Sequence, residues 1–298
     1  MPNESSPRVL AVLGLGHMGR PIAANLVAAK FEVRTWNRSG GMVDGARACA
    51  TIAEAVQGAD VVITMLADDV ALRSVTFGEG KLLATLRRGG IHLSMSTISL
   101  ALAQELDVVH QEASQRFVAC PVFGRPEAAA SRKLWLVPGG DPKDLEYLRN
   151  VLQVLGQGAF PMARPVDAAL AKLCGNFMIA ATIEALAETL TLGEKGGIPP
   201  EQLLEMLTGT LFGAPVVQRY GAMIARTEFT PAGFAMSLGL KDTRLVLEAG
   251  EALRVPMPVA DLVRTRYLTA LARGRADEDW AGLAGVVREE AGLPARRA

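Results

Sequence analysis

The chain has 298 residues, of which 50% are hydrophobic, 21% charged and 5% aromatic. This apolar content excludes a disordered chain, and the length predicts about two domains at the usual size of roughly 100–200 residues each. Lysine plus arginine and aspartate plus glutamate each number 31, so the formal net charge is zero. A balanced charge gives no electrostatic reason to bind nucleic acid or an anionic membrane.

Other broad classes are also disfavoured by the sequence. No apolar run approaches the roughly 18 residues of a membrane span, because glycine or a charged residue interrupts each one. The first residues lack the basic segment of a secretory signal. Cys49, Cys120 and Cys174 lie far apart, without the spacing of metal ligands. We therefore expect a cytoplasmic protein that binds no metal and acts on small molecules.

Strand and helix patterns alternate through the first half of the chain. The expected strands are 9–13, 31–36, 60–66, 91–94, 117–122 and 134–138. The expected helices between them are 21–30, 51–56, 99–112 and 145–155. This alternation, with continuous apolar strands, predicts an α/β fold whose doubly wound parallel sheet is covered on both faces.

The pattern changes near residue 163, after which the strand signals stop. Helical spacing of apolar residues marks 166–193, 200–207, 214–224, 237–253, 258–273 and 280–291. We expect two domains, 1–163 with the sheet and an all-helical 164–298. Helices that are apolar around much of their circumference are usually buried, so the helical domain is expected to pair with another subunit.

A glycine-rich motif follows the first expected strand and opens the first helix. It is G-x-G-x-x-G, formed by Gly14, Leu15, Gly16, His17, Met18 and Gly19. In this context the first glycine allows a tight turn, the second lets the backbone approach a pyrophosphate, and the third lets the helix pack on the sheet. The free N–H groups of the helix start then bind the anion. We expect a Rossmann-type dinucleotide site; the less favoured alternative is a turn without ligand.

The end of the second expected strand bears on which dinucleotide binds. An acidic residue there would hold the ribose 2′-hydroxyl of NAD, but this chain has Asn37, Arg38 and Ser39. Arg38 can pair with a 2′-phosphate, while Asn37 and Ser39 add donors. We expect NADP, with NADPH preferred over NADH. The alternative is that Arg38 is an ordinary surface residue and NAD binds without an acidic anchor.

Two further strand ends belong to the same edge of the predicted sheet. The first offers apolar contacts and backbone amides, from Met65, Leu66 and Ala67. The second offers the hydroxyls of Ser96 and Thr97, which could reach the nicotinamide ribose or a substrate. An equally weighted alternative is that Ser96 and Thr97 cap the next helix.

The first long helix of the second half carries a candidate acid/base pair. Lys172 and Asn176 are four residues apart and share a face, among apolar neighbours. A lysine in such surroundings needs a partner or a polar cleft, which suits a proton donor. The alternative is that its stem reaches solvent. By itself, the adjacent pair Lys241-Asp242 is typical of any solvated helix face.

Taken together, these motifs resemble the β-hydroxyacid dehydrogenase family, which includes 3-hydroxyisobutyrate dehydrogenase and the glyoxylate and succinic semialdehyde reductases. The resemblance runs nearly end to end and covers the glycine motif, Met65-Leu66-Ala67, Ser96-Thr97, the helix from Lys172 to Asn176, and Lys241-Asp242. It implies that Lys172 is the general acid/base and Asn176 orients the substrate. It also implies that Thr97 and Lys241 contact the cofactor and Ser96 the substrate.

One segment departs from that family. Its substrate loop usually reads Asp-Ala-Pro-Val-Ser-Gly-Gly, whereas here it reads Ala119 to Arg125, with Phe123 at the serine and Arg125 at the second glycine. Phe123 offers no hydrogen bond. Arg125 could instead pair with a carboxylate or phosphonate of the substrate, and the alternative is that it bonds to acidic residues of its own domain. Phe123, Gly124 and Arg125 are therefore expected to shape the substrate site and to change which acyl group it accepts.

The expected activity is reversible hydride transfer between NADPH and a small carbonyl or hydroxy compound, with Lys172 moving the proton. The closest alternative is an imine reductase or reductive aminase, which resembles this family and reduces C=N with NADPH. A non-catalytic dinucleotide-binding module is less favoured, because it would not need the Lys172–Asn176 pair. The resemblance further implies a homodimer or homotetramer formed through the helical domain.

Overall fold

The computed structural model describes residues 6–294, and the chain divides into two compact units, Met1–Lys172 and Leu173–Ala298. This division falls within one continuous helix, α9 (Pro165–Lys195). The boundary predicted after residue 163 lies just before that helix begins.

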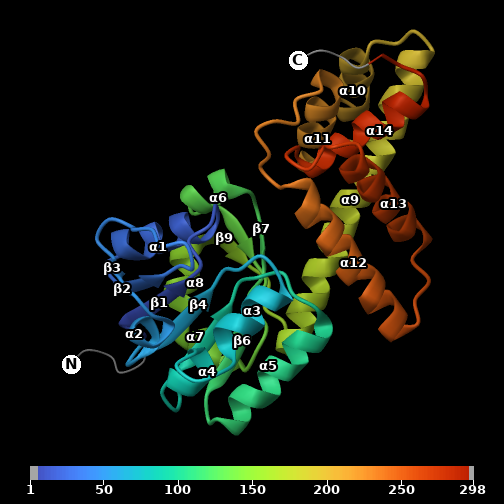
Figure 1. Cartoon of the computed structure of the whole chain (residues 1–298). Coiled ribbons are helices and arrows are strands. Elements are labelled where there is room, and N and C mark those ends of the chain that lie inside the picture. The colour runs from blue at the N-terminus through green and yellow to red at the C-terminus, as the bar shows by residue number, and fades with distance from the viewer. Residues whose placement is uncertain (1–5, 295–298) are drawn as a thin grey trace. The chain divides into compact units, whose positions relative to one another are not determined.

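Six parallel strands form the main sheet of the first unit, in the order β3-β2-β1-β4-β5-β6 (Figure 1). They are β1 (Val9–Leu13), β2 (Glu32–Trp36), β3 (Arg47–Ala48), β4 (Val61–Thr64), β5 (Ile91–Ser94) and β6 (Arg116–Ala119). The strand order reverses between β1 and β4, and ligands bind beyond the carboxyl ends of strands at such a point. The predicted doubly wound parallel sheet is confirmed.

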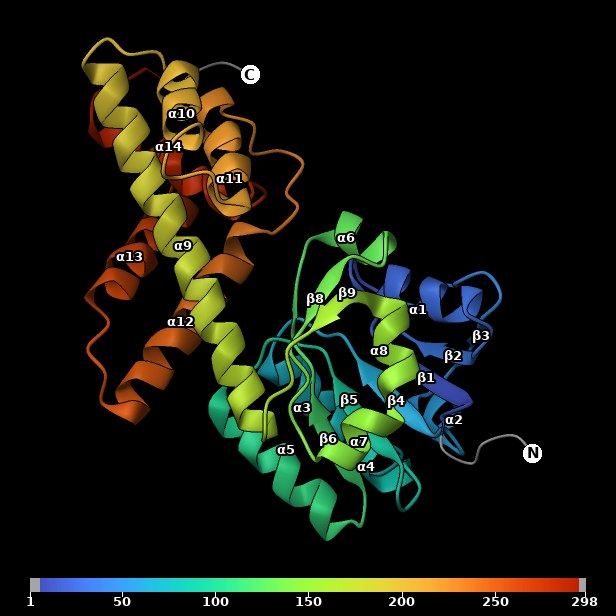
Figure 2. The same cartoon turned by 180° about the vertical axis from the view of Figure 1, so that it is seen from behind.

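Helices cover both faces of this sheet, as Figures 1 and 2 show from opposite sides. They are α1 (Gly19–Ala28), α2 (Ile52–Val56), α3 (Asp69–Thr76), α4 (Leu82–Thr85), α5 (Leu100–Glu112), α6 (Pro126–Ala130), α7 (Pro142–Tyr147) and α8 (Arg149–Leu155). Alternate residues of β1 point to opposite faces. Leu10 and Val12 join the core beneath α1 and α8, whereas Ala11 and Leu13 join the core beneath α2 and α4.

A second, smaller sheet corrects one part of the prediction. It has the order β7-β8-β9, formed by β7 (Val122–Phe123), β8 (Leu134–Leu136) and β9 (Gly156–Ala159), and β7 runs antiparallel to β8. The expected single strand 117–122 is therefore two strands in different sheets. Pro121 is the reason, because proline has no N–H to continue the ladder inside a sheet.

Several short elements were not predicted. These are β3, α3, α4, α6 and β9. The helix expected at 145–155 is two helices, α7 and α8, which meet at Leu148, and Asp141 caps α7 by accepting from the Lys143 amide at 2.8 Å. Short elements contain too few residues to show a period, so their formation depends on packing more than on pattern.

Among the described residues, every regular element after β9 is helical, as expected. Besides α9 these are α10 (Pro200–Thr208), α11 (Pro215–Arg226), α12 (Met236–Leu253), α13 (Pro258–Ala272), the 3₁₀ helix η1 (Trp280–Gly282) and α14 (Leu283–Glu290). One apolar core joins them, and it includes Ile183 and Leu190 of α9, Tyr267 of α13 and Trp280 of η1.

Helix α9 corrects the expectation about apolar runs. By length and composition it could span a membrane, with a mean hydropathy of 1.4 in its most apolar window, of which 39% is buried. The statement that no run is long enough is therefore wrong for 165–195. Core helices of globular proteins meet the same two criteria, and Ile183 and Leu190 place α9 in the helical core.

A buried polar chain crosses the first unit beneath α5. Thr64 Oγ1 lies 3.0 Å from His92 Nε2, His92 Nδ1 lies 2.9 Å from His110 Nε2, and His110 Nδ1 lies 2.8 Å from Gln115 Oε1. Gln115 Nε2 donates to the carbonyls of Leu83 and Leu86. Both rings are fully buried, and burial lowers the pKa of His110 to about 4 and that of His92 well below its usual range. The two imidazoles are therefore neutral.

Candidate active site

The glycine motif adopts the geometry that a dinucleotide requires. Gly14 has a φ of +102°, and a Cβ there would lie 2.4 Å from the Met65 carbonyl oxygen. A Cβ on Gly19 would lie 1.9 Å from the Gly14 carbonyl oxygen, so only glycine lets α1 start this close to β1. A Cβ on Gly16 would meet nothing within 4 Å. Gly14 and Gly19 thus build the turn, and the open space at Gly16 fits the approach of a pyrophosphate.

The end of β2 is tied to this motif by Asn37. The Leu15 amide donates to Asn37 Oδ1 at 3.1 Å, while Asn37 Nδ2 donates to Ser39 Oγ at 2.9 Å and to the Gly40 carbonyl at 2.8 Å. The side-chain amide of Asn37 is therefore used to fix the loop between β2 and β3. Among the described residues, Arg38 is exposed and has no hydrogen bond or ion pair, which leaves its guanidinium available to a ligand.

A second arginine lies beside the same loop. Arg20, in the first turn of α1, donates from Nη1 to the Met42 carbonyl at 2.6 Å, and its Nη2 is 3.1 Å from the position of a Cβ on Gly41. We did not single out Arg20 from the sequence, because one arginine in the first turn of a helix is common. Arg20 and Arg38 place two cationic groups near the end of β2. His17 is exposed, and Met18 is the half-buried N-cap residue of α1.

The segments after β4 and β5 are joined directly. The Leu66 amide donates to the buried Ser96 hydroxyl at 2.8 Å, and Ser99 Oγ donates to Asp69 Oδ2 at 2.5 Å. Ser99 caps α5 by accepting from the Leu102 amide at 3.0 Å, so the alternative that Ser96 and Thr97 cap this helix is wrong. Ala67 is exposed and Thr97 is half-buried at the same edge.

Phe123 and Lys172 are in direct contact within the first unit. The Lys172 ammonium lies 4.1 Å from the centroid of the Phe123 ring, and Lys172 is buried. A cation at this distance from an aromatic face is attracted by the ring quadrupole. Gly124 follows with a φ of +142°, and a Cβ there would lie 2.7 Å from Leu134 Cδ2. Arg125 is half-buried at the start of α6.

Within the second unit, Asp242 organises two of the predicted residues. Asn176 Nδ2 donates to Asp242 Oδ2 at 2.5 Å, and Lys241 Nζ lies 2.7 Å from Asp242 Oδ1. Asp242 is buried, so its carboxylate fixes the direction of the Asn176 amide. Sequence reasoning passed over Asp242 because adjacent opposite charges are common on exposed helices. The apolar residues around it in α12 were the signal that it is buried.

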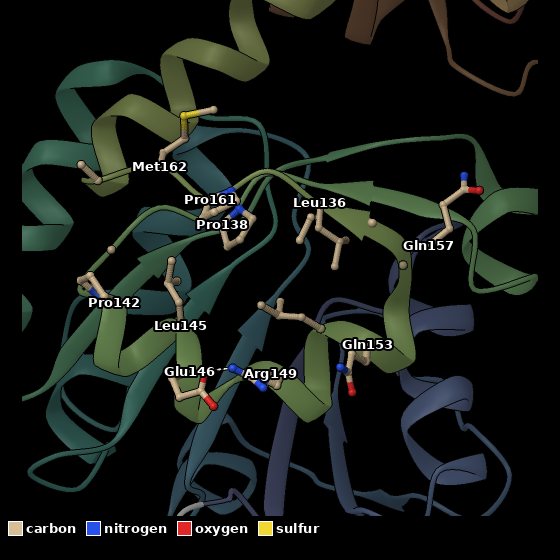
Figure 3. Close-up of a pocket in the computed structure, with 16 residues that line it drawn as sticks. Leu136, Pro138, Pro142, Leu145, Glu146, Arg149, Gln153, Gln157, Pro161 and Met162 are labelled. Atoms are coloured by element: carbon tan, nitrogen blue, oxygen red, sulfur yellow. Dashed lines mark hydrogen bonds and ion pairs between the residues drawn. The ribbon is translucent and has the colours of Figure 1, made fainter.

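One cavity of the first unit is lined by other residues than these. It measures about 740 Å³ and is walled mainly by apolar side chains of β8, α7, α8 and the segment after β9, with an ion pair between Glu146 and Arg149 at its margin (Figure 3). None of the predicted site residues lines it. Among residues 6–294, no group of three or more His, Cys, Asp or Glu is placed to hold a metal ion.

Comparison with known families matches almost the whole chain. Residues 9–167 match the NAD-binding domain of 6-phosphogluconate dehydrogenase, and residues 167–287 match a second family, described as NAD-binding of NADP-dependent 3-hydroxyisobutyrate dehydrogenase. The chain therefore belongs to the β-hydroxyacid dehydrogenase family. It is an NAD(P)-dependent oxidoreductase of this family, as the resemblance in the sequence indicated.

Individual relatives agree with this assignment. The chain is 41% identical over 280 residues to the uncharacterized oxidoreductase YfjR of Bacillus subtilis, covering 92% of this chain and 98% of the relative. It is 30% identical over 282 residues to the NAD-dependent L-serine dehydrogenase of Pseudomonas aeruginosa, covering 91% and 95%.

Solved structures show the same fold. A 3-hydroxyisobutyrate dehydrogenase of Mycobacterium tuberculosis with L-serine has a TM-score of 0.85 at 29% identity, covering 94% of this chain and 99% of that one. An imine reductase of Myxococcus stipitatus with NADP⁺ has a TM-score of 0.61 at 20% identity, covering 93% and 99%.

Proposed function

We propose that this protein reduces a carbonyl compound with NADPH, or oxidises the corresponding alcohol, with Lys172 as the general acid/base. The observation that carries the proposal is a buried lysine held in one place against the Phe123 ring. A lysine kept out of bulk water and fixed by a neighbour is suited to deliver a proton to one defined atom.

The chain's own residues would hold a bound cofactor at the edge formed by β1, β2, β4 and β5. The backbone at Gly16 would contact the pyrophosphate, and Arg38 would pair with the 2′-phosphate of the adenosine ribose. The segment Met65–Ala67 would supply apolar contacts and backbone amides. NADPH, when bound, supplies the hydride. Lys172 donates a proton to the carbonyl oxygen as negative charge grows there, and takes it back in the reverse direction. Asn176, with its amide fixed by Asp242, orients the same oxygen.

Replacing Lys172 tests its assignment. Lys172→Ala should lower kcat by about 10²–10⁴-fold, the usual contribution of general acid/base catalysis, while the Kd for NADPH changes less than twofold. Lys195→Ala, which removes a lysine from the other end of α9, is the matched control and should keep its activity. Turnover of Lys172→Ala within threefold of wild type would exclude this lysine as the acid/base.

The preference for NADPH is a separate proposal, supported by the unpaired guanidinium of Arg38 and by Arg20 beside the same loop. A charge-assisted hydrogen bond contributes about 1.5–3 kcal/mol, and about 1.4 kcal/mol corresponds to tenfold. Arg38→Ala should therefore lower the NADPH/NADH ratio of kcat/KM about tenfold to a hundredfold. Arg88→Ala, at an exposed position after α4, should leave it unchanged. An unaltered ratio in Arg38→Ala would favour the NAD-dependent alternative.

Reduction of C=N remains the second candidate. Phe123 favours it, because a phenyl ring gives an apolar wall where a carboxylate-binding residue could stand. Initial rates with glyoxylate, succinic semialdehyde and a cyclic imine, each with NADPH and NADH, separate the two activities. Turnover of the imine alone would reject the carbonyl proposal.

Assembly and location are also proposed. Apolar side chains of α9 such as Met178 and Leu192 are exposed in the single chain, which supports a homodimer or homotetramer formed through the helical unit. Sedimentation velocity would report the subunit number. All three cysteines are free thiols, in keeping with a cytoplasmic location.

A further inference from the structure

Three aromatic side chains form a row on the outer face of the small sheet, and we call Phe123, Trp135 and Phe160 the aromatic ledge. Phe123 and Trp135 stand directly opposite each other in the antiparallel β7–β8 pair, so their side chains share one face. The ring of Trp135 lies 5.8 Å from that of Phe160, centroid to centroid. The row therefore crosses the small sheet from β7 to the residue after β9.

The packing of β9 leaves room for the ledge. A Cβ on Gly158 would lie 2.4 Å from Trp135 Cζ3, so the indole rests against this strand only because residue 158 is glycine. On the opposite face of the same sheet, Val122, Leu134 and Leu136 are buried in the core. Outward positions of a half-buried antiparallel pair are usually polar, but these are aromatic.

Two of the three rings of the ledge are exposed, and the third, Phe123, is half-buried and begins the row at the proposed proton donor. Trp135 is 43% and Phe160 56% exposed, while the Phe123 ring contacts the Lys172 ammonium at 4.1 Å. Contiguous exposed aromatic groups beside polar reactive groups are typical of ligand-binding surfaces. Under the proposed function, a substrate held at Lys172 also lies beside Phe123, so its substituent can extend from there along the ledge.

The side chains of the ledge favour an apolar substituent. The phenyl rings of Phe123 and Phe160 offer no hydrogen bonds, and the indole of Trp135 has a single N–H donor, so most of the ledge surface would remove water from a carboxylate without replacing its hydrogen bonds. We propose that the aromatic ledge binds an apolar substituent, aryl or long alkyl, of the substrate that Lys172 protonates. This inference rests on the proposed function. It names the substrate class as an apolar aldehyde, ketone or imine, in place of a small hydroxy acid.

The test compares an apolar with a small charged substrate. In Trp135→Ala and in Phe160→Ala, the ratio of kcat/KM for 3-phenylpropanal over glyoxylate should fall at least fivefold. The matched control is Phe212→Ala, which removes a phenyl ring that is 52% exposed in the second unit and should leave the ratio within twofold. An unchanged ratio in both ledge variants would overturn the proposal.

A binding measurement separates the ledge from the catalytic assignment. In Lys172→Ala with NADP⁺, 3-phenylpropan-1-ol should change the tryptophan fluorescence, and Trp135→Phe in that background should remove the change yet keep binding by calorimetry. If Lys172→Ala retains turnover while the alcohol still binds, the catalytic assignment of Lys172 is wrong and the proposal for the ledge is supported.

If Lys172 is essential but the alcohol causes no fluorescence change, the proposal for the ledge is wrong. Dissociation of Trp135→Ala or Phe160→Ala into smaller oligomers would show that the aromatic ledge is a contact between subunits, and would also overturn the proposal.

Discussion

At the scale of single residues, an aromatic ring stabilises the charged form of a nearby amine. Phe123 does this for Lys172, since the ammonium lies over its ring. From the sequence, Phe123 could be recognised only as a large apolar residue in an unusual place. Its contact with Lys172 joins β7 to α9, which are distant in the chain, so it forms only in the folded protein.

The pH dependence of catalysis should reveal this contact. Phe123→Leu removes the ring and disfavours the ammonium, so the pH above which reduction slows should move to lower values. A cation–π contact of about 0.5–2 kcal/mol, at about 1.36 kcal/mol per pH unit, predicts a shift of about 0.4 to 1.5 pH units. Phe123→Tyr keeps an aromatic face and should behave as wild type. Identical pH profiles of kcat/KM in all three proteins would show that the ring does not influence the lysine.

At the scale of elements, the start of α1 needs glycine for two reasons: close packing against the Gly14 carbonyl at Gly19, and open space for a ligand at Gly16. The sequence motif predicted the close packing at Gly19, because its spacing between a strand and a helix is specific, and the pyrophosphate contact at Gly16 stays a prediction. It could not show how Asn37 bonds to Leu15, since that hydrogen bond joins β2 to the loop after β1. The antiparallel β7–β8 pair was missed for a similar reason: two- and three-residue strands have no readable period.

Two alanine variants distinguish the glycine needed for stability from the glycine proposed to contact the cofactor. Gly19→Ala should destabilise the first unit by about 1–3 kcal/mol, because its Cβ would overlap the Gly14 carbonyl oxygen. Gly16→Ala has open space around its Cβ and should keep wild-type stability, but its Kd for NADPH should rise at least tenfold. Chemical denaturation and fluorescence titration measure the two effects. Tight NADPH binding by Gly16→Ala would show that the pyrophosphate does not approach this residue.

At the scale of the whole molecule, the composition allowed a two-domain α/β protein, and the longer elements of both halves followed from periodicity, whereas several short ones did not. The residues proposed for catalysis could be predicted only in part. Lys172 and Asn176 share a helix, so their spacing was visible, whereas Asp242 belongs to α12 and meets Asn176 only after folding. The buried histidines were also unpredicted, because a histidine in an apolar strand gives no sign of its partners.

Those histidines make the global stability depend on pH. His110 has a pKa of about 4 when folded, against an ordinary value of 6.5, so the unfolded chain binds more protons between these values. Its contribution to the free energy of unfolding is therefore fully present above pH 6.5 and is lost as the pH falls toward 4. At about 1.36 kcal/mol per pH unit, the loss reaches about 3 kcal/mol.

Denaturation curves at several pH values between 7 and 4.5 would measure this loss. His110→Gln removes the titrating imidazole, so it should reduce the pH slope of the unfolding free energy by the equivalent of about one proton. An equal slope in wild type and His110→Gln would contradict the assignment of His110 as a buried neutral group.

The same buried chain also constrains how the sequence can vary. Gln115 donates to two carbonyls, so its oxygen must accept from His110, His110 from His92, and His92 from the Thr64 hydroxyl. Every hydrogen therefore points the same way, from Thr64 toward Leu83 and Leu86. A substitution of any one of these four residues leaves its neighbours without a hydrogen-bond partner. One substitution alone therefore destabilises the fold more than coordinated substitutions that preserve the hydrogen bonds. Positions 64, 92, 110 and 115 should therefore be inherited as a block in the protein's descendants.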